Sequence, residues 1–162
     1  MRIYHGSDRI IQVPQIIKGR RVDYGTGFYT TTSYQQAEDW VKTKHQNQLF
    51  LQGFVNVYEF DLTQAEQYLR VKKFALHPTE EWFDFVENNR MNPTFEHDWD
   101  VVYGPVADDR VFAAFALYES GVLSREETIR ELKTYKLKDQ YLLHTERALQ
   151  YITFIEAKEV KL

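Results

Sequence analysis

Hydrophobic and polar residues alternate along several short segments of the chain, a pattern typical of half-buried β-strands. We expect strands at residues 2–5, 54–62, 68–71, 100–103, 141–143 and 151–155. Gly6 is expected to end the first strand, and Gly104 with Pro105 to end the fourth. Within residues 54–62, Asn56 is the polar exception on a face formed otherwise by apolar side chains.

Helices are predicted where apolar residues recur three and four positions apart behind a residue that favours an N-cap. The expected N-terminal residues are Ser33, Thr79, Asp108 or Asp109, Ser124 and Thr145. Gln36 and Glu127 follow the first and second of these serines by three positions, which is the spacing of a capping box. Strands and helices follow one another without regular βαβ alternation, so the predicted fold class is α+β.

Composition indicates one folded domain over residues 1–162. The chain is 43% hydrophobic with 11 Tyr, 11 Phe and 3 Trp, which excludes a disordered protein. A net charge of −4 argues against a protein that works mainly on phosphate backbones. The absence of cysteine excludes disulfides and cysteine-bound zinc and favours the reducing cytoplasm. The longest apolar run, residues 111–118, is far shorter than the roughly 20 residues that span a bilayer, so no membrane segment is expected.

The segment over residues 7–27 is predicted to be a loop, and it holds three of the seven glycines. Glycines beside the aromatic Tyr24, Phe28 and Tyr29 let a backbone approach a flat or phosphorylated ligand closely, although an ordinary surface loop has the same composition. Two other clusters have plainer interpretations. His97 and its acidic neighbours lack a second histidine at metal-ligand spacing, and the cations of residues 18–21 are typical of a solvated loop.

Three segments together resemble the ADP-ribosyltransferase superfamily, in the diphtheria-toxin and poly(ADP-ribose) polymerase branch that carries a His, Tyr and Glu triad. They are residues 4–7 (Tyr-His-Gly-Ser), 23–33 (Asp-Tyr-Gly-Thr-Gly-Phe-Tyr-Thr-Thr-Thr-Ser) and 140–141 (Gln-Tyr). Residues 100–110 and 145–149 are similar to an uncharacterised bacterial, toxin-like subgroup (DUF3990-like), whose members often accompany a small antitoxin-like protein. The resemblance implies a split antiparallel β-sandwich of two small sheets with surrounding helices.

The resemblance also implies a site for NAD as co-substrate, with no metal. His5 would bond a ribose hydroxyl, and the backbone N–H and C=O of Gly6 would hold the nicotinamide carboxamide. Tyr29 would stack on the nicotinamide ring, with Trp40 as a second face. The remaining residues of the expected NAD site are Ser7, Gly27 and Thr30.

The third catalytic position departs from the family pattern, because Gln140 stands where the family has glutamate. Glutamine keeps hydrogen bonding but loses the charge and the base. Asp108 or Asp109 could lend a carboxylate, and the alternative is an ordinary N-cap with charge that compensates the helix dipole.

The expected function is mono-ADP-ribosyl transfer from NAD to an unknown macromolecular acceptor, by the toxin of a bacterial toxin–antitoxin pair. His5, Tyr29 and Gln140 would be the catalytic residues. The alternatives are a non-catalytic module that binds NAD or ADP-ribose and a protein-interaction domain.

Overall fold

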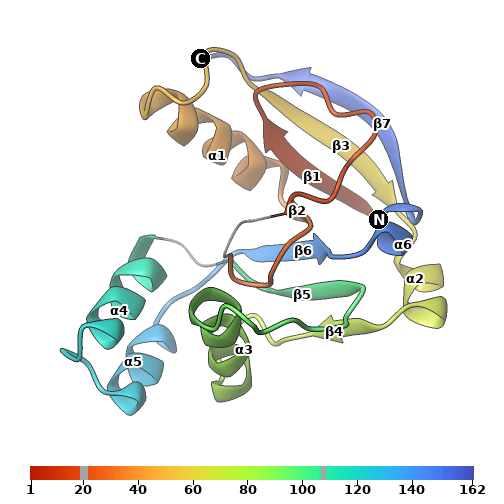
Figure 1. The fold of residues 1–162 in the computed structure, drawn as a ribbon. Helices are drawn as coiled ribbons and strands as arrows, with labels where there is room; N and C mark the ends of the chain where they lie inside the picture. Colours follow the sequence, from red (N-terminus) through yellow and green to blue (C-terminus); the bar gives the residue numbers. More distant parts are fainter. Residues whose placement is uncertain (19–21, 107–108) are drawn as a thin grey trace.

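The chain forms two β-sheets with helices around them in a computed structural model that describes residues 1–18, 22–106 and 109–162 (Figure 1). The strands are β1 (Arg2–Ser7), β2 (Phe28–Thr30), β3 (Phe54–Phe60), β4 (Val71–Lys73), β5 (Val101–Pro105), β6 (Asp139–Leu143) and β7 (Ile152–Glu159). The helices are α1 (Tyr34–Gln46), α2 (Leu62–Tyr68), α3 (Glu80–Met91), α4 (Asp109–Glu119), α5 (Arg125–Leu132) and α6 (Glu146–Leu149). This arrangement confirms the α+β class.

The first sheet has the strand order β1-β3-β7, and all of its pairs are antiparallel. The second sheet has the order β2-β6-β5-β4, and its β4–β5 pair is parallel. The expectation of two purely antiparallel sheets is therefore wrong at β4. The physical reason is the connection: the chain passes through α3 between β4 and β5, and such a helical crossover returns the chain in its original direction.

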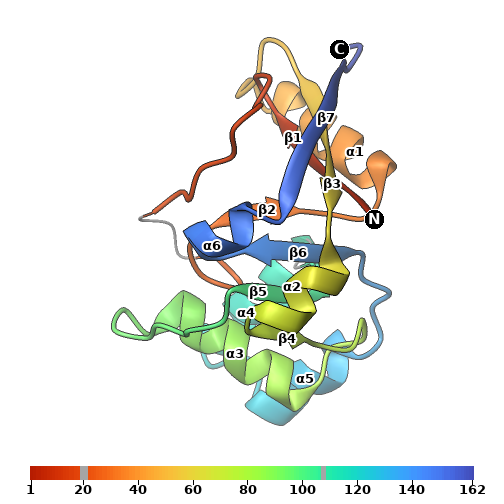
Figure 2. The ribbon, with the colours of Figure 1, turned by 90° about the vertical axis from the view of Figure 1, so that its right-hand side faces the viewer.

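Side chains of the second sheet alternate between two separate cores. Phe28, Val101, Tyr141 and Leu143 face the first sheet and pack with Ile3, Tyr58 and Phe60. Val102 and Leu142 face the other way and pack against the helical layer, with Trp82, Phe83, Phe115 and Leu132. Figures 1 and 2 show α3, α4 and α5 beneath the second sheet, while α1 lies beside β1 and β3. The buried apolar side chains of the second sheet are thereby divided between the two cores.

Two strands continue through the residues that were expected to end them. β1 runs through Gly6 to Ser7, because both residues pair with β3. β5 runs through Gly104 and Pro105, and the next residue, Val106, still donates its N–H to Lys138 O at 2.7 Å. Alternation places position 105 where a backbone N–H would point away from β6, so proline is tolerated there.

Two further predicted strands have different bounds. Residues 62–68 form α2, with Asp61 as N-cap, so the strand expected near 68–71 begins only at Val71. The C-terminal strand is longer than predicted and extends to Glu159.

The capping residues are mostly where the sequence places them. Thr79 and Thr145 cap α3 and α6, and Ser124 forms the complete capping box with Glu127. Ser33 caps α1, but the second half of its capping box is wrong. The Ser33 N–H donates to Thr31 Oγ1 at 3.1 Å, and Gln36 Nε2 donates to Asp139 O at 3.2 Å. Helix α4 begins at Asp109, and Asp108 lies outside the described residues. None of the described helices is long and apolar enough to cross a membrane.

The start of β5 is held by the buried carboxylate of Asp100. Its Oδ1 accepts from Thr145 Oγ1 at 2.6 Å and from Arg147 Nη2 at 3.1 Å, and its Oδ2 accepts from the Arg70 N–H at 3.0 Å. Burial alone would raise the pKa of Asp100, but these hydrogen bonds and the charge of Arg147 bring it below its ordinary value. The carboxylate thus ties β5 to α6 and to the segment before β4.

Asp100→Asn is expected to lower the free energy of unfolding by about 1–3 kcal/mol, because the amide leaves donors around it without an acceptor. Chemical denaturation at pH 7 measures this change. Asp98→Asn is the matched control: Asp98 is exposed and pairs with the Arg70 side chain, so the expected loss is under about 1 kcal/mol. Equal small losses in the two variants would contradict the role assigned to Asp100.

Candidate functional site

The two sheets meet where β1 runs beside the end of β2. The Tyr4 N–H donates to Thr31 O at 2.8 Å, and the Thr31 N–H donates to Tyr4 O at 2.9 Å. One step further along β1 the backbone pairing stops. There, His5 Nδ1 lies 2.6 Å from Tyr29 O and takes the place of a backbone donor. The ring of His5 therefore stands at the point where the two strands separate.

Gly6 presents an edge of β1 at this point. Since the peptide groups of Tyr4 face Thr31, those of Gly6, two residues further on, face the same side. Among the described residues, none on that side bonds the N–H or C=O of Gly6. A Cβ at Gly6 would lie 2.7 Å from Ala37 O and 2.8 Å from Val41 Cγ2, so the close packing of α1 requires glycine. The result is a buried backbone edge with a donor and an acceptor side by side.

The hydrogen bond to Tyr29 fixes the tautomer of His5. A carbonyl oxygen can only accept, so Nδ1 carries the proton and Nε2 is an acceptor. Burial lowers the pKa of His5, and its hydrogen bond to the Tyr29 carbonyl opposes this in part. The ring also stacks on Phe28, with 4.3 Å between ring centroids. His5 is thus held as a neutral imidazole with Nε2 available to accept.

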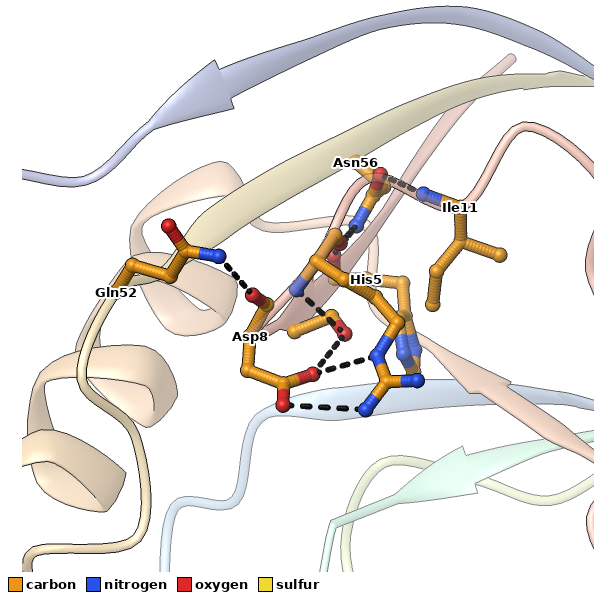
Figure 3. Close-up of polar contacts among 7 residues, drawn as sticks. His5, Asp8, Ile11, Gln52 and Asn56 are labelled. Atoms are coloured by element: carbon orange, nitrogen blue, oxygen red, sulfur yellow. Dashed lines mark hydrogen bonds and ion pairs between the residues drawn. The ribbon is translucent and has the colours of Figure 1, made fainter.

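The segment after Ser7 is held by Asn56, which is fully buried on β3 (Figure 3). Asn56 Nδ2 donates to Arg9 O at 3.1 Å and to His5 O at 3.4 Å, and Oδ1 accepts from the Ile11 N–H at 2.8 Å. Ser7 Oγ accepts from the Arg9 N–H at 3.3 Å. The polar exception noted in the sequence is therefore the residue that fixes the path of the chain beyond His5.

The backbone carbonyl of Tyr29 contacts His5, while the Tyr29 side chain lies on the face of the second sheet that points away from the first sheet. Its ring packs against the core beneath that sheet. Its hydroxyl donates to Gly25 O at 2.6 Å and accepts from the Tyr24 N–H at 3.1 Å. Burial raises the pKa of Tyr29 well above its ordinary value. The Tyr29 hydroxyl is thus committed to the glycine-rich loop.

Two histidines bond the same loop. His97 Nε2 donates to Tyr24 O at 2.7 Å, and His144 Nδ1 donates to Thr26 O at 2.6 Å. Their ring centroids are 4.0 Å apart. With the bond from Tyr29 to Gly25, three successive carbonyls of the loop are bonded by three side chains from different parts of the chain.

Gln140 lies on the same face of the second sheet as Tyr29 and is buried. Its Nε2 donates to Pro105 O at 3.1 Å, and the Tyr24 hydroxyl donates to the same carbonyl at 2.7 Å. His5 and Gly6 belong to the first sheet. The structure therefore places the predicted catalytic residues in two groups, His5 at the junction of the sheets and Tyr29 with Gln140 on the helical side.

The other predicted NAD-site residues lie around these groups. Trp40 is 43% exposed on α1, beside Gly6, and its ring contacts Phe50 and Lys44. Thr30 is buried, and its hydroxyl donates to Tyr141 O at 3.0 Å. At Gly27 (φ 146°), a Cβ would lie 2.4 Å from Leu143 O. Arg20 and Arg21, from the basic cluster, lie outside the described residues.

A carboxylate next to Gln140, which no motif singled out, ties β6 to β5 and to the segment between β2 and α1. Asp139 Oδ1 accepts from Thr31 Oγ1 and from the Thr32 N–H, both at 3.0 Å. Its Oδ2 accepts from the Thr32 hydroxyl and, at 3.1 Å, from the Tyr103 hydroxyl. Its position directly before Gln140 was the available sequence signal. Asp139 fixes the turn from β2 into α1, and so the position of α1, which packs against Gly6.

Fold and site together define an α+β protein with a histidine–glycine strand edge at the junction of two sheets. The chain belongs to the protein family of unknown function DUF3990, whose model matches residues 1–154. Comparison with curated proteins and with solved structures finds no match.

The hydrogen bond from His97 to the glycine-rich loop predicts that the folded protein loses stability in acid. Burial, with a smaller contribution from His144, lowers the pKa of His97 to about 4, while hydrogen bonding to Tyr24 opposes the shift. Its Nδ1 accepts from the Trp99 N–H at 3.2 Å, so only the neutral ring satisfies both partners. The folded-state pKa lies below the unfolded value of about 6.5. The stability that neutral His97 contributes is therefore complete above pH 6.5 and decreases as the pH falls toward 4.

His97→Gln retains a donor for Tyr24 O but does not titrate, so its melting temperature should fall less than that of the wild type between pH 7 and pH 4.5. His77→Gln, at an exposed histidine, is the control and should follow the wild type. Thermal unfolding measured by circular dichroism tests this. Melting temperatures that fall in parallel for the wild type and His97→Gln would contradict this role of His97.

Proposed function

We propose that this protein is an NAD-dependent mono-ADP-ribosyltransferase, which cleaves the nicotinamide–ribose bond and transfers ADP-ribose to a macromolecular acceptor. The observation that supports this most is that the N–H and C=O of Gly6 face the point where β1 and β2 separate, beside His5. The proposed setting is a bacterial toxin–antitoxin pair with a small antitoxin partner, and the support for this setting is the sequence resemblance.

The edge of Gly6 is chemically suited to a carboxamide. A carboxamide carries an N–H donor and a C=O acceptor side by side, so it can pair with one extended residue as a neighbouring strand does. Nicotinamide bound in this way extends the Tyr4–Thr31 pairing by one pair of hydrogen bonds. The Gly6 donor and acceptor, which would be costly to leave buried and unbonded, are then satisfied.

His5 supplies an acceptor beside the same edge. With Nδ1–H committed to Tyr29 O, its Nε2 can accept a hydrogen bond from a ribose hydroxyl. The lowered pKa keeps the ring neutral near pH 7, so this acceptor is retained at physiological pH. A ribose hydroxyl becomes a better donor as the sugar gains positive charge, which makes this bond stronger in the transition state than in bound NAD.

In the proposed reaction the bond between C1′ and the nicotinamide nitrogen breaks, and nicotinamide leaves with the bonding electrons. The lone pair of the acceptor then adds at C1′ of the oxocarbenium-like sugar, and any proton on the attacking atom passes to solvent. The protein contributes by holding the carboxamide at Gly6 and the ribose at His5. Catalysis comes from those contacts that strengthen as charge develops.

His5→Asn separates the two roles of the imidazole. The Asn amide can still donate to Tyr29 O from nearly the position of Nδ1, but it has no group at the position of Nε2. NAD affinity is expected to fall at least about tenfold, the equivalent of one lost hydrogen bond, while the fold is retained. Titration calorimetry with NAD measures the affinity, and circular dichroism checks the fold.

His45→Asn is the matched control, because His45 Nδ1 donates to Phe50 O at 2.8 Å in the same way. It is expected to bind NAD like the wild type. Unchanged NAD affinity in His5→Asn, or an equal loss of affinity in His45→Asn, would show that His5 does not form part of the NAD site.

A non-catalytic module that binds NAD or ADP-ribose is the second candidate. The observation that favours it is the amide of Gln140, which supplies no negative charge and is bonded to Pro105 O. General-base help is typically worth 10²–10⁴-fold, so a transferase without it is expected to be slow.

Nicotinamide release separates the two candidates. Purified protein with NAD and a bacterial cell extract is expected to release nicotinamide, detected by liquid chromatography, and His5→Asn is expected to release far less. If the wild type releases none although calorimetry shows that NAD binds, the transferase proposal is wrong and the binding module takes its place.

A further inference from the structure

The carbonyl of Pro105 is the centre of a buried hydrogen-bond network beneath the second sheet. It accepts from Gln140 Nε2 at 3.1 Å and from the Tyr24 hydroxyl at 2.7 Å. The Tyr24 hydroxyl in turn accepts from Trp82 Nε1 at 2.8 Å. Tyr24 and Trp82 are fully buried, and Gln140 is 7% exposed. Every donor in this chain therefore has one carbonyl or hydroxyl partner away from water.

The backbone opposite Gln140 is shaped to admit this network. Gly104 pairs with Gln140 across β5 and β6, so their side-chain positions lie on the same face. A Cβ at Gly104 would lie 2.4 Å from the Tyr24 hydroxyl oxygen and 3.1 Å from Phe74 Cβ. The missing side chain of Gly104 is what leaves room for the Tyr24 hydroxyl beside the Gln140 amide.

The chemistry of the carbonyl decides how Gln140 is oriented. A carbonyl oxygen has no proton to give, so the atom that lies 3.1 Å from it has to be a donor, which assigns that end of the amide as Nε2. The Tyr24 hydroxyl also donates to Pro105 O. It stays protonated, because burial raises the pKa of Tyr24 well above its ordinary value. The groups beside position 140 therefore favour a neutral donor.

We propose that Pro105 and Tyr24 are positioning residues for Gln140, and that position 140 is built for an amide and rejects a carboxylate. A carboxylate oxygen in the place of Nε2 would face the lone pairs of Pro105 O at hydrogen-bond distance, in a buried site without a cation in the network described above. Such an arrangement is tolerated only when the carboxyl is protonated and donates its O–H to the carbonyl.

The consequence for the reaction rests on the proposed function. A transferase with this arrangement has a neutral amide, bonded to Pro105 O, where the ADP-ribosyltransferase pattern has glutamate, so position 140 neither neutralises the sugar cation nor takes a proton from the acceptor. Glutamate at position 140 is then expected to disturb the site rather than to improve it, although the ADP-ribosyltransferase pattern has glutamate there.

Stability measured against pH tests the proposal without NAD, so its failure is distinct from failure of the proposed function. Gln140→Glu is expected to melt at a lower temperature than the wild type at pH 8, and the difference should shrink as the pH falls to 5. The sign follows from the carboxyl: repulsion and burial raise its folded-state pKa above the unfolded value of about 4.3. The penalty is therefore complete above the folded pKa and disappears as the carboxyl becomes protonated.

Gln140→Leu and Gln15→Glu are the controls. Gln140→Leu removes the donor without adding a charge, so it should lose stability by an amount that does not change with pH. Gln15→Glu adds the same charge at an exposed loop position and should follow the wild type. If Gln140→Glu is unfolded at pH 8, recovery of its circular dichroism spectrum at pH 5 supports the proposal. A stability difference that does not depend on pH, or no difference at all, would overturn it.

Discussion

Within the part of the chain that the structure describes, backbone hydrogen bonds join the two sheets where β1 meets the end of β2, and the candidate site follows from how this contact is bonded. Tyr4 and Thr31 exchange two backbone hydrogen bonds, and the next bond comes from the ring of His5 to Tyr29 O. This bond puts a side chain in the place of a backbone donor where the backbone pairing of β1 with β2 ends. It leaves the N–H and C=O of Gly6 facing the junction, and it also sets the tautomer of His5. The free edge of Gly6 and the acceptor at His5 Nε2 are thus both linked to the bond between the His5 ring and Tyr29 O.

Around this junction, buried and half-buried polar side chains hold neighbouring segments together. Asn56 holds the chain beyond Ser7, Asp139 holds the turn into α1, and the Tyr24 network holds Gln140 beneath the second sheet. Asn56 bonds three backbone groups, whereas Asp139 and the Tyr24 network each bond one backbone group together with other side chains. Partners of this kind make a polar group acceptable in a core. The face on which each side chain lies is a further constraint. Tyr29 and Gln140 share one face of the second sheet, while His5 approaches from the first sheet.

Local signals in the sequence predicted much of the fold. Caps such as Thr79 and Ser124 were identified correctly because a cap depends on residues within one helical turn. The end of β5 was wrong at Gly104 because the strand is continued by its partner β6, which is distant in sequence. Helix α2 was missed because, of its seven residues, Ala65 alone is buried, which leaves no apolar stripe to detect. His5, Gly6 and Tyr29 were recognised as neighbours from their motifs, but the face that each occupies depends on strand register, which no motif encodes.

The proposed function depends on one contact, in which the edge of Gly6 binds the carboxamide of nicotinamide beside His5. The most direct measurement is the amide proton chemical shift of Gly6 in isotope-labelled protein during titration with NAD. The Gly6 amide should show a saturable downfield shift, because its N–H gains an acceptor, while the Thr31 amide, already bonded to Tyr4 O, should move little. An unchanged Gly6 amide in protein that binds NAD, as judged by shifts elsewhere, would contradict this contact.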